Sequence, residues 1–331
     1  MISILKSKGF QAFLGLVIST LLIGWLLVSV NWSEVWSELM KVNCLWLVPV
    51  TLLFFIHFYL RSLRWRYLLP SHASVPLGRL FDSIMVGNFA TYVLPLRAGE
   101  FIRPYMLTLH SVYSFSSCFV SVIIERFCDL ALVLIAFGVM IIFVHDVPPL
   151  AHQGALSLSV VALMLFAFML LGGLAPAKML QLCELFVVLL PKKLQTSIRK
   201  FISDFLEGAV VLGNINNLLR VVMLTILVWL TCFLQYYFFL YMFEVEVTVW
   251  FAVSVAVMVA LAVAAPSAPG FIGVYQAGCV AAFALFGVKR ELAVAFSIIT
   301  HVYQFLLCIG LGVYVLARSN LKLSQLRSPQ L

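Results

Sequence analysis

The chain has 331 residues, of which 64% are hydrophobic and only 10% are charged, and its mean hydropathy is +1.11. Soluble domains carry about 25% charged residues, so this composition excludes a water-solvated globule. Backbone polar groups inside lipid must be satisfied within the protein, which leaves helices or a closed barrel. The apolar runs are about as long as a spanning helix and lack strand-like alternation. The sequence therefore predicts an all-α polytopic membrane protein.

The formal net charge of +8 comes from 21 Lys and Arg against 13 Asp and Glu. Most basic residues flank apolar runs, which is typical of topology signals and of attraction to anionic lipid, so we expect no nucleic-acid partner. The seven cysteines are scattered, mostly through apolar runs, without the spacing of metal ligands. We therefore expect neither a metal site nor a disulfide framework, and no cofactor.

Apolar length and basic flanks predict about six full spans, with both termini in the cytoplasm. Residues 10–30 form the first span, and the segment 31–41, with Trp32 and Trp36 four apart, suits an interfacial helix outside. A basic amphipathic helix along the inner surface is predicted over 192–217. The other full spans are predicted at 44–60, 117–144, 155–175, 219–243 and 292–317.

Two further apolar segments are interrupted by proline and glycine. The segment 80–115 breaks at LPLRAGE (94–100), and the segment 249–288 breaks at APSAPGFIG (265–273). We expect each to be a re-entrant helical hairpin, the first opened from the cytoplasm and the second from outside, with its unwound tip enclosed by protein. The residues predicted to make the breaks are Pro95, Gly99, Pro266, Pro269, Gly270 and Gly273.

The hairpins divide a single transmembrane domain, residues 1–331, into halves of about 1–150 and 151–331. Their predicted topologies are inverted copies, and Pro95-x-x-x-Gly99 recurs as Pro266-x-x-x-Gly270. Paired interruptions in inverted halves point to a substrate site near the midplane of a transporter. The N-terminal ends of the helices that restart after each tip favour an anionic group such as phosphate.

Charged residues adjoin the first break, where each costs roughly 2.5–3.5 kcal/mol at the bilayer centre and is usually functional. Two interpretations are open. The acids Glu100, Glu125 and Asp129 neutralise the arginines and pin the hairpin, or at least one arginine keeps a free fork for a lipid phosphate. The candidate lipid-binding residues are Asn88, Arg97, Glu100, Arg103, Glu125, Arg126, Asp129, Tyr275 and Gln276.

Other polar residues in or near the spans have simpler interpretations. Arg61, Arg64 and Arg66 are interpreted mainly as topology signals, with a headgroup contact as the alternative. His57 and His301 are interpreted as packing residues rather than proton relays.

Four motifs in order resemble the flippase-like membrane domain named for the lysylphosphatidylglycerol synthase transmembrane region. They are RSLRWRYLL (61–69), Asn88 with LPLRAGEFIRPY (94–105), ERFCD (125–129) and PSAPGFIGVYQAG (266–278). The resemblance implies a bacterial cytoplasmic-membrane protein that moves or binds an amphiphilic lipid, since relatives are associated with aminoacylated phosphatidylglycerol, hopanoids and polyprenyl-linked glycans. Many members carry Arg-Glu in the second element, where Tyr275 and Gln276 stand here, and the soluble aminoacyltransferase domain of the full synthase is not expected.

Three functions follow as hypotheses. The first is a lipid transporter, with membrane lipids as partners and no enzymatic activity. The second is a membrane enzyme acting on a lipid headgroup, for which Glu100 and Asp129 are the attractive carboxylates. The third is an accessory subunit for a lipid-pathway enzyme. Nothing matches a nucleotide-binding loop, so a transporter would depend on an ion gradient, the membrane potential or downhill movement. The lipid, the direction of movement and the oligomeric state are left open.

Overall fold

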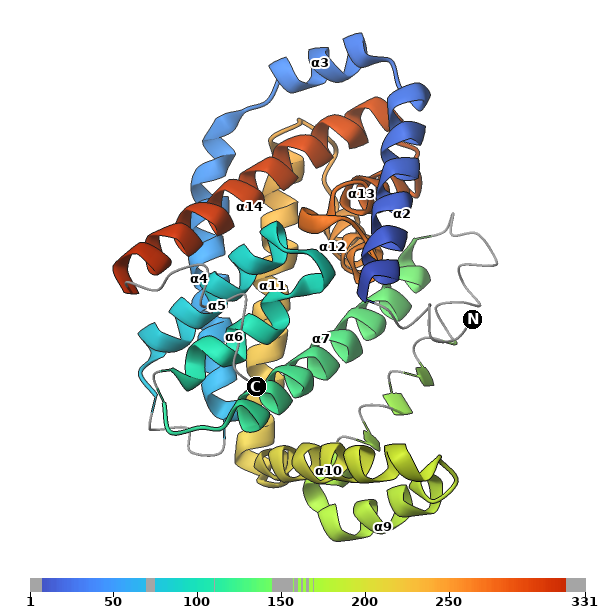
Figure 1. Ribbon diagram of the computed structural model, residues 1–331. Coiled ribbons are helices and arrows are strands. Elements are labelled where there is room, and N and C mark those ends of the chain that lie inside the picture. Colours follow the sequence, from blue (N-terminus) through green and yellow to red (C-terminus); the bar gives the residue numbers. More distant parts are fainter. Residues whose placement is uncertain are drawn as a thin grey trace.

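The computed structural model describes residues 8–69, 75–109, 111–144 and 170–319, with single positions between 157 and 168. Every regular element in these ranges is a helix, as predicted (Figure 1). The first part of the chain forms α2 (Lys8–Ser29), α3 (Trp32–Met40), the 3-10 turn η1 (Cys44–Trp46), α4 (Leu47–Leu68), α5 (Leu77–Val93), η2 (Pro95–Arg97), α6 (Gly99–Thr108) and α7 (Phe115–Phe143).

The second part forms α9 (Pro176–Val187), α10 (Lys192–Ala209), η3 (Val210–Gly213), α11 (Ile215–Tyr241), α12 (Val249–Ala264), η4 (Pro269–Phe271), α13 (Val274–Ala284) and α14 (Arg290–Ser319). The predicted helix over 192–217 is wrong at its C-terminal end. It stops at Ala209, and Asn214 caps α11 instead, because its side-chain oxygen accepts hydrogen bonds from the amides of Asn216 and Asn217. The predicted span at 155–175 lies mostly outside the described residues.

Among the described residues, four helices are long and apolar enough to cross a membrane: Cys44–Leu68, Phe115–Phe143, Ile215–Tyr241 and Arg290–Ser319. The pair Phe13–Ser29 and Trp32–Met40 would make a fifth, although it is bent by 89°. Such a bend suits a span followed by a helix along the interface, the arrangement predicted for 10–41. The chain is thus a multi-pass membrane protein.

Three apolar clusters of described residues hold the bundle together, and the smallest joins α7 to α12. The first packs the α5–α6 pair against α4, α7 and α14, with Trp65, Met85 and Met106 fully or almost fully buried. The second packs α12 and α13 against α11 and α14 around Phe283 and Phe296. The helix α4 runs beside α11, and α14 crosses between the two interrupted pairs (Figure 1). Each interrupted pair therefore packs on neighbouring helices, while tip residues such as Leu96 and Ile272 remain exposed.

Both interrupted segments form helical hairpins, in which α5 packs on α6 and α12 packs on α13. The first hairpin is shorter than the predicted 80–115, since α6 ends at Thr108. A Cβ atom built on Gly99 would lie 1.9 Å from the carbonyl oxygen of Gly87 and 2.1 Å from Oγ1 of Thr91. Gly99 therefore lets two helix backbones approach closely.

The role predicted for Gly99 in the reversal itself is wrong, because its φ is not positive. Leu96 and Arg97 turn the chain instead, with φ values of 59° and 51°. In the second hairpin the expectation is met, since Gly270 and Gly273 have φ values of 72° and 90°.

A Gly99→Ala substitution should destabilise the protein by about 1–3 kcal/mol, because the added methyl group would force the backbones of α5 and α6 apart. Thermal unfolding of the detergent-purified protein, followed by size-exclusion chromatography after heating, measures this. The control is Gly78→Ala, in the first turn of α5, where a Cβ would meet nothing within 4 Å. Equal stability of the two variants would contradict the close packing at Gly99.

Candidate functional site

The tip of the first hairpin is an unwound segment with unusual backbone geometry. Helix α5 ends at Val93, and Pro95 begins the single turn η2. Leu96 and Arg97 are consecutive non-glycine residues in the left-handed region. Such conformations are sparsely populated and cost of order 1–3 kcal/mol each, and they cluster at functional sites. The backbone conformation of Arg97 therefore makes it a candidate functional residue.

The two hairpin tips meet. The guanidinium of Arg97 donates a hydrogen bond to the carbonyl oxygen of Val263, in the last turn of α12, and lies 5.3 Å from the ring centroid of Phe271. Tyr92, at the end of α5, contacts the same ring edge-on at 5.8 Å. A cation at a helix C-terminus is favoured by the exposed carbonyls and the helix dipole. Arg97 therefore joins the first tip to the end of the opposite hairpin.

A cavity of about 460 Å³ lies between the tips and α2. Arg97 is the one charged residue among the described residues that line it, and Thr91 and Ser267 supply hydroxyl groups. Helix α2 closes one side, where the hydroxyl of Ser19 accepts a hydrogen bond from the amide of Ala268. The other lining residues are Leu14, Leu94, Leu96, Ala264, Ala265, Pro266, Ala268, Pro269 and Phe271.

Behind the first tip lies a buried group of ion pairs, which we call the locked cluster: Arg61, Arg64, Arg103, Glu125 and Asp129. Glu125 has no solvent exposure and accepts two hydrogen bonds from Arg103, at 2.9 and 2.8 Å, and one from Arg61 at 2.8 Å. Arg64 makes a two-pronged contact with Asp129 at 2.6 and 3.2 Å. Buried charges are tolerated when they are paired and hydrogen-bonded in this way. The locked cluster fixes α6 to α4 and α7.

A second group, the loose cluster, consists of Arg97, Glu100 and Arg126. Glu100 lies 3.8 Å from Arg97 and 3.7 Å from Arg126, and the side chains are 33%, 37% and 44% exposed in that order. Among the described residues, no hydrogen bond joins the Glu100 carboxylate to either guanidinium. The two clusters together hold five guanidiniums and three carboxylates, a surplus of two positive charges. The site as a whole therefore attracts an anion.

The second hairpin contributes a neutral polar network. The hydroxyl of Tyr275 donates to Thr300 at 3.0 Å and lies 3.2 Å from the hydroxyl of Tyr236. Gln276 accepts from the amide of Gly273 and lies 3.1 Å from Nδ1 of His301. These contacts bind α13 to α11 and α14. The two candidates predicted at this tip thus lie in a packing network, apart from the charged clusters.

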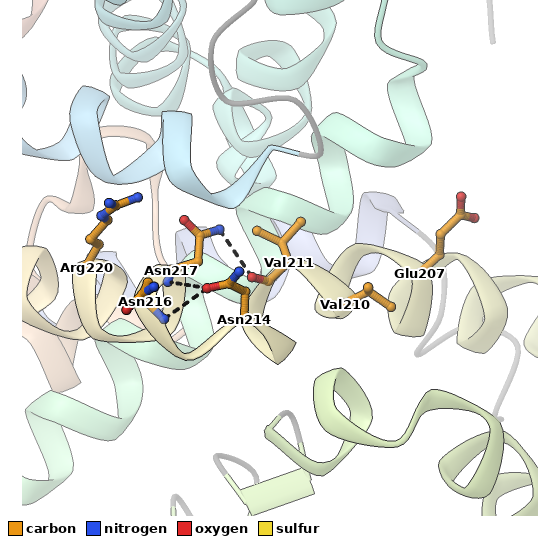
Figure 2. A pocket seen from close by; sticks show the side chains of 7 residues that line it. All are labelled: Glu207, Val210, Val211, Asn214, Asn216, Asn217 and Arg220. Atoms are coloured by element: carbon orange, nitrogen blue, oxygen red, sulfur yellow. Dashed lines mark hydrogen bonds between the residues drawn. The ribbon is translucent and has the colours of Figure 1, made fainter.

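A separate polar pocket of about 380 Å³ lies where η3 meets α11 (Figure 2). Asn214 points its oxygen back at the first turn of α11, and Asn217 donates to the carbonyl of Val211. Figure 2 shows Glu207 and Arg220 at opposite ends of the pocket, so their charges do not converge on one point. The asparagines mainly stabilise the chain reversal into α11.

The comparisons with known proteins bear on this arrangement. The profile of the lysylphosphatidylglycerol synthase TM region family matches residues 12–312, which include both hairpins and both clusters. The chain belongs to this family. No curated protein and no solved structure matches it. Membership in the lysylphosphatidylglycerol synthase TM region family gives the protein a lipid-related membrane function.

Two residues of the family-like motif at 61–69 have a role that sequence reasoning missed. Arg61 and Arg64, interpreted mainly as topology signals, are 9% and 0% exposed and pair with Glu125 and Asp129. The signal was available: two arginines three apart and two acids four apart each lie along one face of an apolar helix. A buried face with charges at that spacing predicts mutual pairing.

The other candidates divide between the clusters. Arg103, Glu125 and Asp129 belong to the locked cluster, as the pinning interpretation expects. Asn88, on α5, stands apart: its buried side-chain nitrogen has no hydrogen-bond partner among the described residues.

Replacing Glu125 with Gln should destabilise the protein by about 3–5 kcal/mol, because Arg61 and Arg103 would lose their buried counter-charge while the side-chain shape is kept. Heating the detergent-solubilised variant and measuring the remaining monodisperse fraction tests this. Glu38→Gln, at an exposed pair with Lys41, is the matched control and should unfold like the unsubstituted protein. Wild-type stability of Glu125→Gln would show that the locked cluster does not hold the hairpin.

Proposed function

We propose that this protein is a lipid transporter of the flippase type, which moves an anionic amphiphilic lipid across the bacterial cytoplasmic membrane. The candidate substrates are phospholipids, hopanoids with an anionic headgroup and polyprenyl-linked phosphates. The lipid phosphate binds Arg97 and Arg126, and its chains remain toward the apolar outer face of the bundle. Membrane lipids are the partners that this function requires.

The observation that carries the proposal is the cavity between the two hairpin tips, with Arg97 on its wall. Unwound backbone at membrane depth is tolerated only inside protein or beside a water-filled cavity. Arginine presents a planar fork of donors that matches phosphate oxygens, and a charge placed in a membrane domain is usually functional. A cavity at two broken helices with one guanidinium on its wall fits a phosphate headgroup.

The arrangement of the halves supports transport across the bilayer. Each half contributes one interrupted helical pair, and the tips of both pairs meet at one cavity. We propose that the two hairpins are re-entrant and inverted, with both chain termini in the cytoplasm. In transporters with such repeats, rocking of one half against the other exposes a fixed site to each side in turn.

Transport is favoured over catalysis by the state of the carboxylates. Glu125 is fully buried among arginines, and Asp129 accepts hydrogen bonds from Arg64 and from the indole of Trp229 at 3.1 Å. A general acid or base needs a carboxylate within reach of the reacting atom. Glu100 alone of the three has no hydrogen bond among the described residues, and one loosely paired acid makes a poor catalytic constellation.

The double variant Arg97→Gln, Arg126→Gln should reduce translocation of a fluorescent phosphatidylglycerol analogue in liposomes by at least tenfold, because the phosphate loses both charged partners. Dithionite quenching of the analogue in the outer leaflet measures the rate. The control is Arg290→Gln, which removes an exposed guanidinium stacked 5.0 Å from Trp25, away from the cavity. Unchanged translocation in the double variant, at equal reconstitution, would overturn the site assignment.

A further inference from the structure

The contacts of Glu100 differ from those of every other carboxylate at the site. Glu125 and Asp129 accept hydrogen bonds at 2.6–3.2 Å from guanidiniums that have little or no exposure. Glu100 lies between two half-exposed guanidiniums at 3.7 and 3.8 Å, too far for a hydrogen bond with either. A guanidinium has five donors in a fixed fork, and Arg126 donates no hydrogen bond among the described residues. The loose cluster therefore has donors available on Arg126, which is linked through Glu100 to Arg97 on the cavity wall.

Glu100 lies between the two guanidiniums that the proposed lipid phosphate would contact. It lies in the first turn of α6, three residues after Arg97, and faces Arg126 on α7. A carboxylate there is favoured by the helix N-terminus without needing a close ion pair. A phosphate oxygen that approached both guanidiniums would come close to Glu100, and like charges at that separation repel.

We propose that Glu100 is an internal counter-ion of the empty site, which a lipid phosphate displaces when it binds. This inference rests on the proposed function and names the substrate class more narrowly: a lipid whose phosphate headgroup carries a net negative charge. A zwitterionic headgroup has the same phosphodiester, but its ammonium group would stand near Arg97 and Arg126. A zwitterionic lipid would therefore gain less binding free energy when its phosphate displaces Glu100. Glu100 thus competes with the ligand for Arg97 and Arg126, and a headgroup with a net negative charge competes best.

The proposal assigns opposite effects to neighbouring residues. Loss of Arg97 or Arg126 removes attraction and weakens binding of an anionic lipid. Loss of the Glu100 charge removes a competitor and should tighten binding by about fivefold or more, the effect of one charge at contact distance in a water-like dielectric. Tighter binding slows release, so the same variant should transport more slowly. A residue that served only the fold would not strengthen binding when substituted.

The test uses detergent-purified full-length protein titrated with dioctanoyl phosphatidylglycerol, dioctanoyl phosphatidylcholine or inorganic phosphate in a calorimeter. Glu100→Gln should bind the phosphatidylglycerol at least about fivefold more tightly than the unsubstituted protein, with no gain for the phosphatidylcholine. Glu100→Ala repeats the test with a strong helix former, in case the amide makes new contacts. Glu34→Gln is the matched control, since Glu34 is also in the first turn of a helix and lies in α3.

The outcomes separate this inference from the proposed function. If Arg97→Gln weakens phosphatidylglycerol binding while Glu100→Gln and Glu100→Ala leave it equal or weaker, the counter-ion role is wrong and the lipid site stands. If Arg97→Gln and Arg126→Gln leave binding unchanged, the lipid site itself is wrong. Binding of inorganic phosphate as tight as that of phosphatidylglycerol would assign the site to a free anion and overturn the lipid proposal.

Discussion

A carboxylate with no solvent exposure, Glu125, is the point on which the arrangement of the first hairpin depends. It accepts hydrogen bonds from Arg61 on α4 and Arg103 on α6, while its own helix is α7. Since an unpaired buried charge is strongly destabilising, separating these three helices would be costly. That arrangement places the unwound tip against the end of α12 and orients Arg97 toward the cavity. The locked cluster thus positions the tip of the first hairpin, and the neighbouring loose cluster holds the guanidiniums that are not tightly paired.

Much of the fold could be predicted from the sequence, because lipid imposes strict demands on helix length and on breaks. The helical class, the long apolar helices and the two interrupted segments follow from run length, Pro95, Pro266 and the paired glycines. The turn residues of the first hairpin did not follow. Leu96 and Arg97 carry no local preference for the left-handed region, and only the tertiary contacts of the tip hold them there.

The sequence predicted which charged residues gather at the first hairpin, but not their division into a locked and a loose cluster. Charge spacing identified the candidates Arg97, Glu100, Arg103 and Arg126. It did not show which guanidiniums are fully hydrogen-bonded to a carboxylate. The pairing depends on α4, because Arg61 and Arg64 lie 64 and 65 positions before their partners, Glu125 and Asp129. Pairing accounts for the buried arginines, as the first interpretation expects. The second interpretation, a free arginine fork for a lipid phosphate, stays a prediction.

One wall of the cavity comes from outside the hairpins. Leu14 of α2 is the sole lining residue among the described ones that lies beyond the two tips, and the helix rests on the second tip through Gly15 and Ser19. At its far end the chain turns by 89° into α3. A ligand that filled the cavity would therefore contact α2 as well as the two tips. The helix α2, although none of its residues belongs to the locked or the loose cluster, thus helps to shape the space in which a ligand would lie.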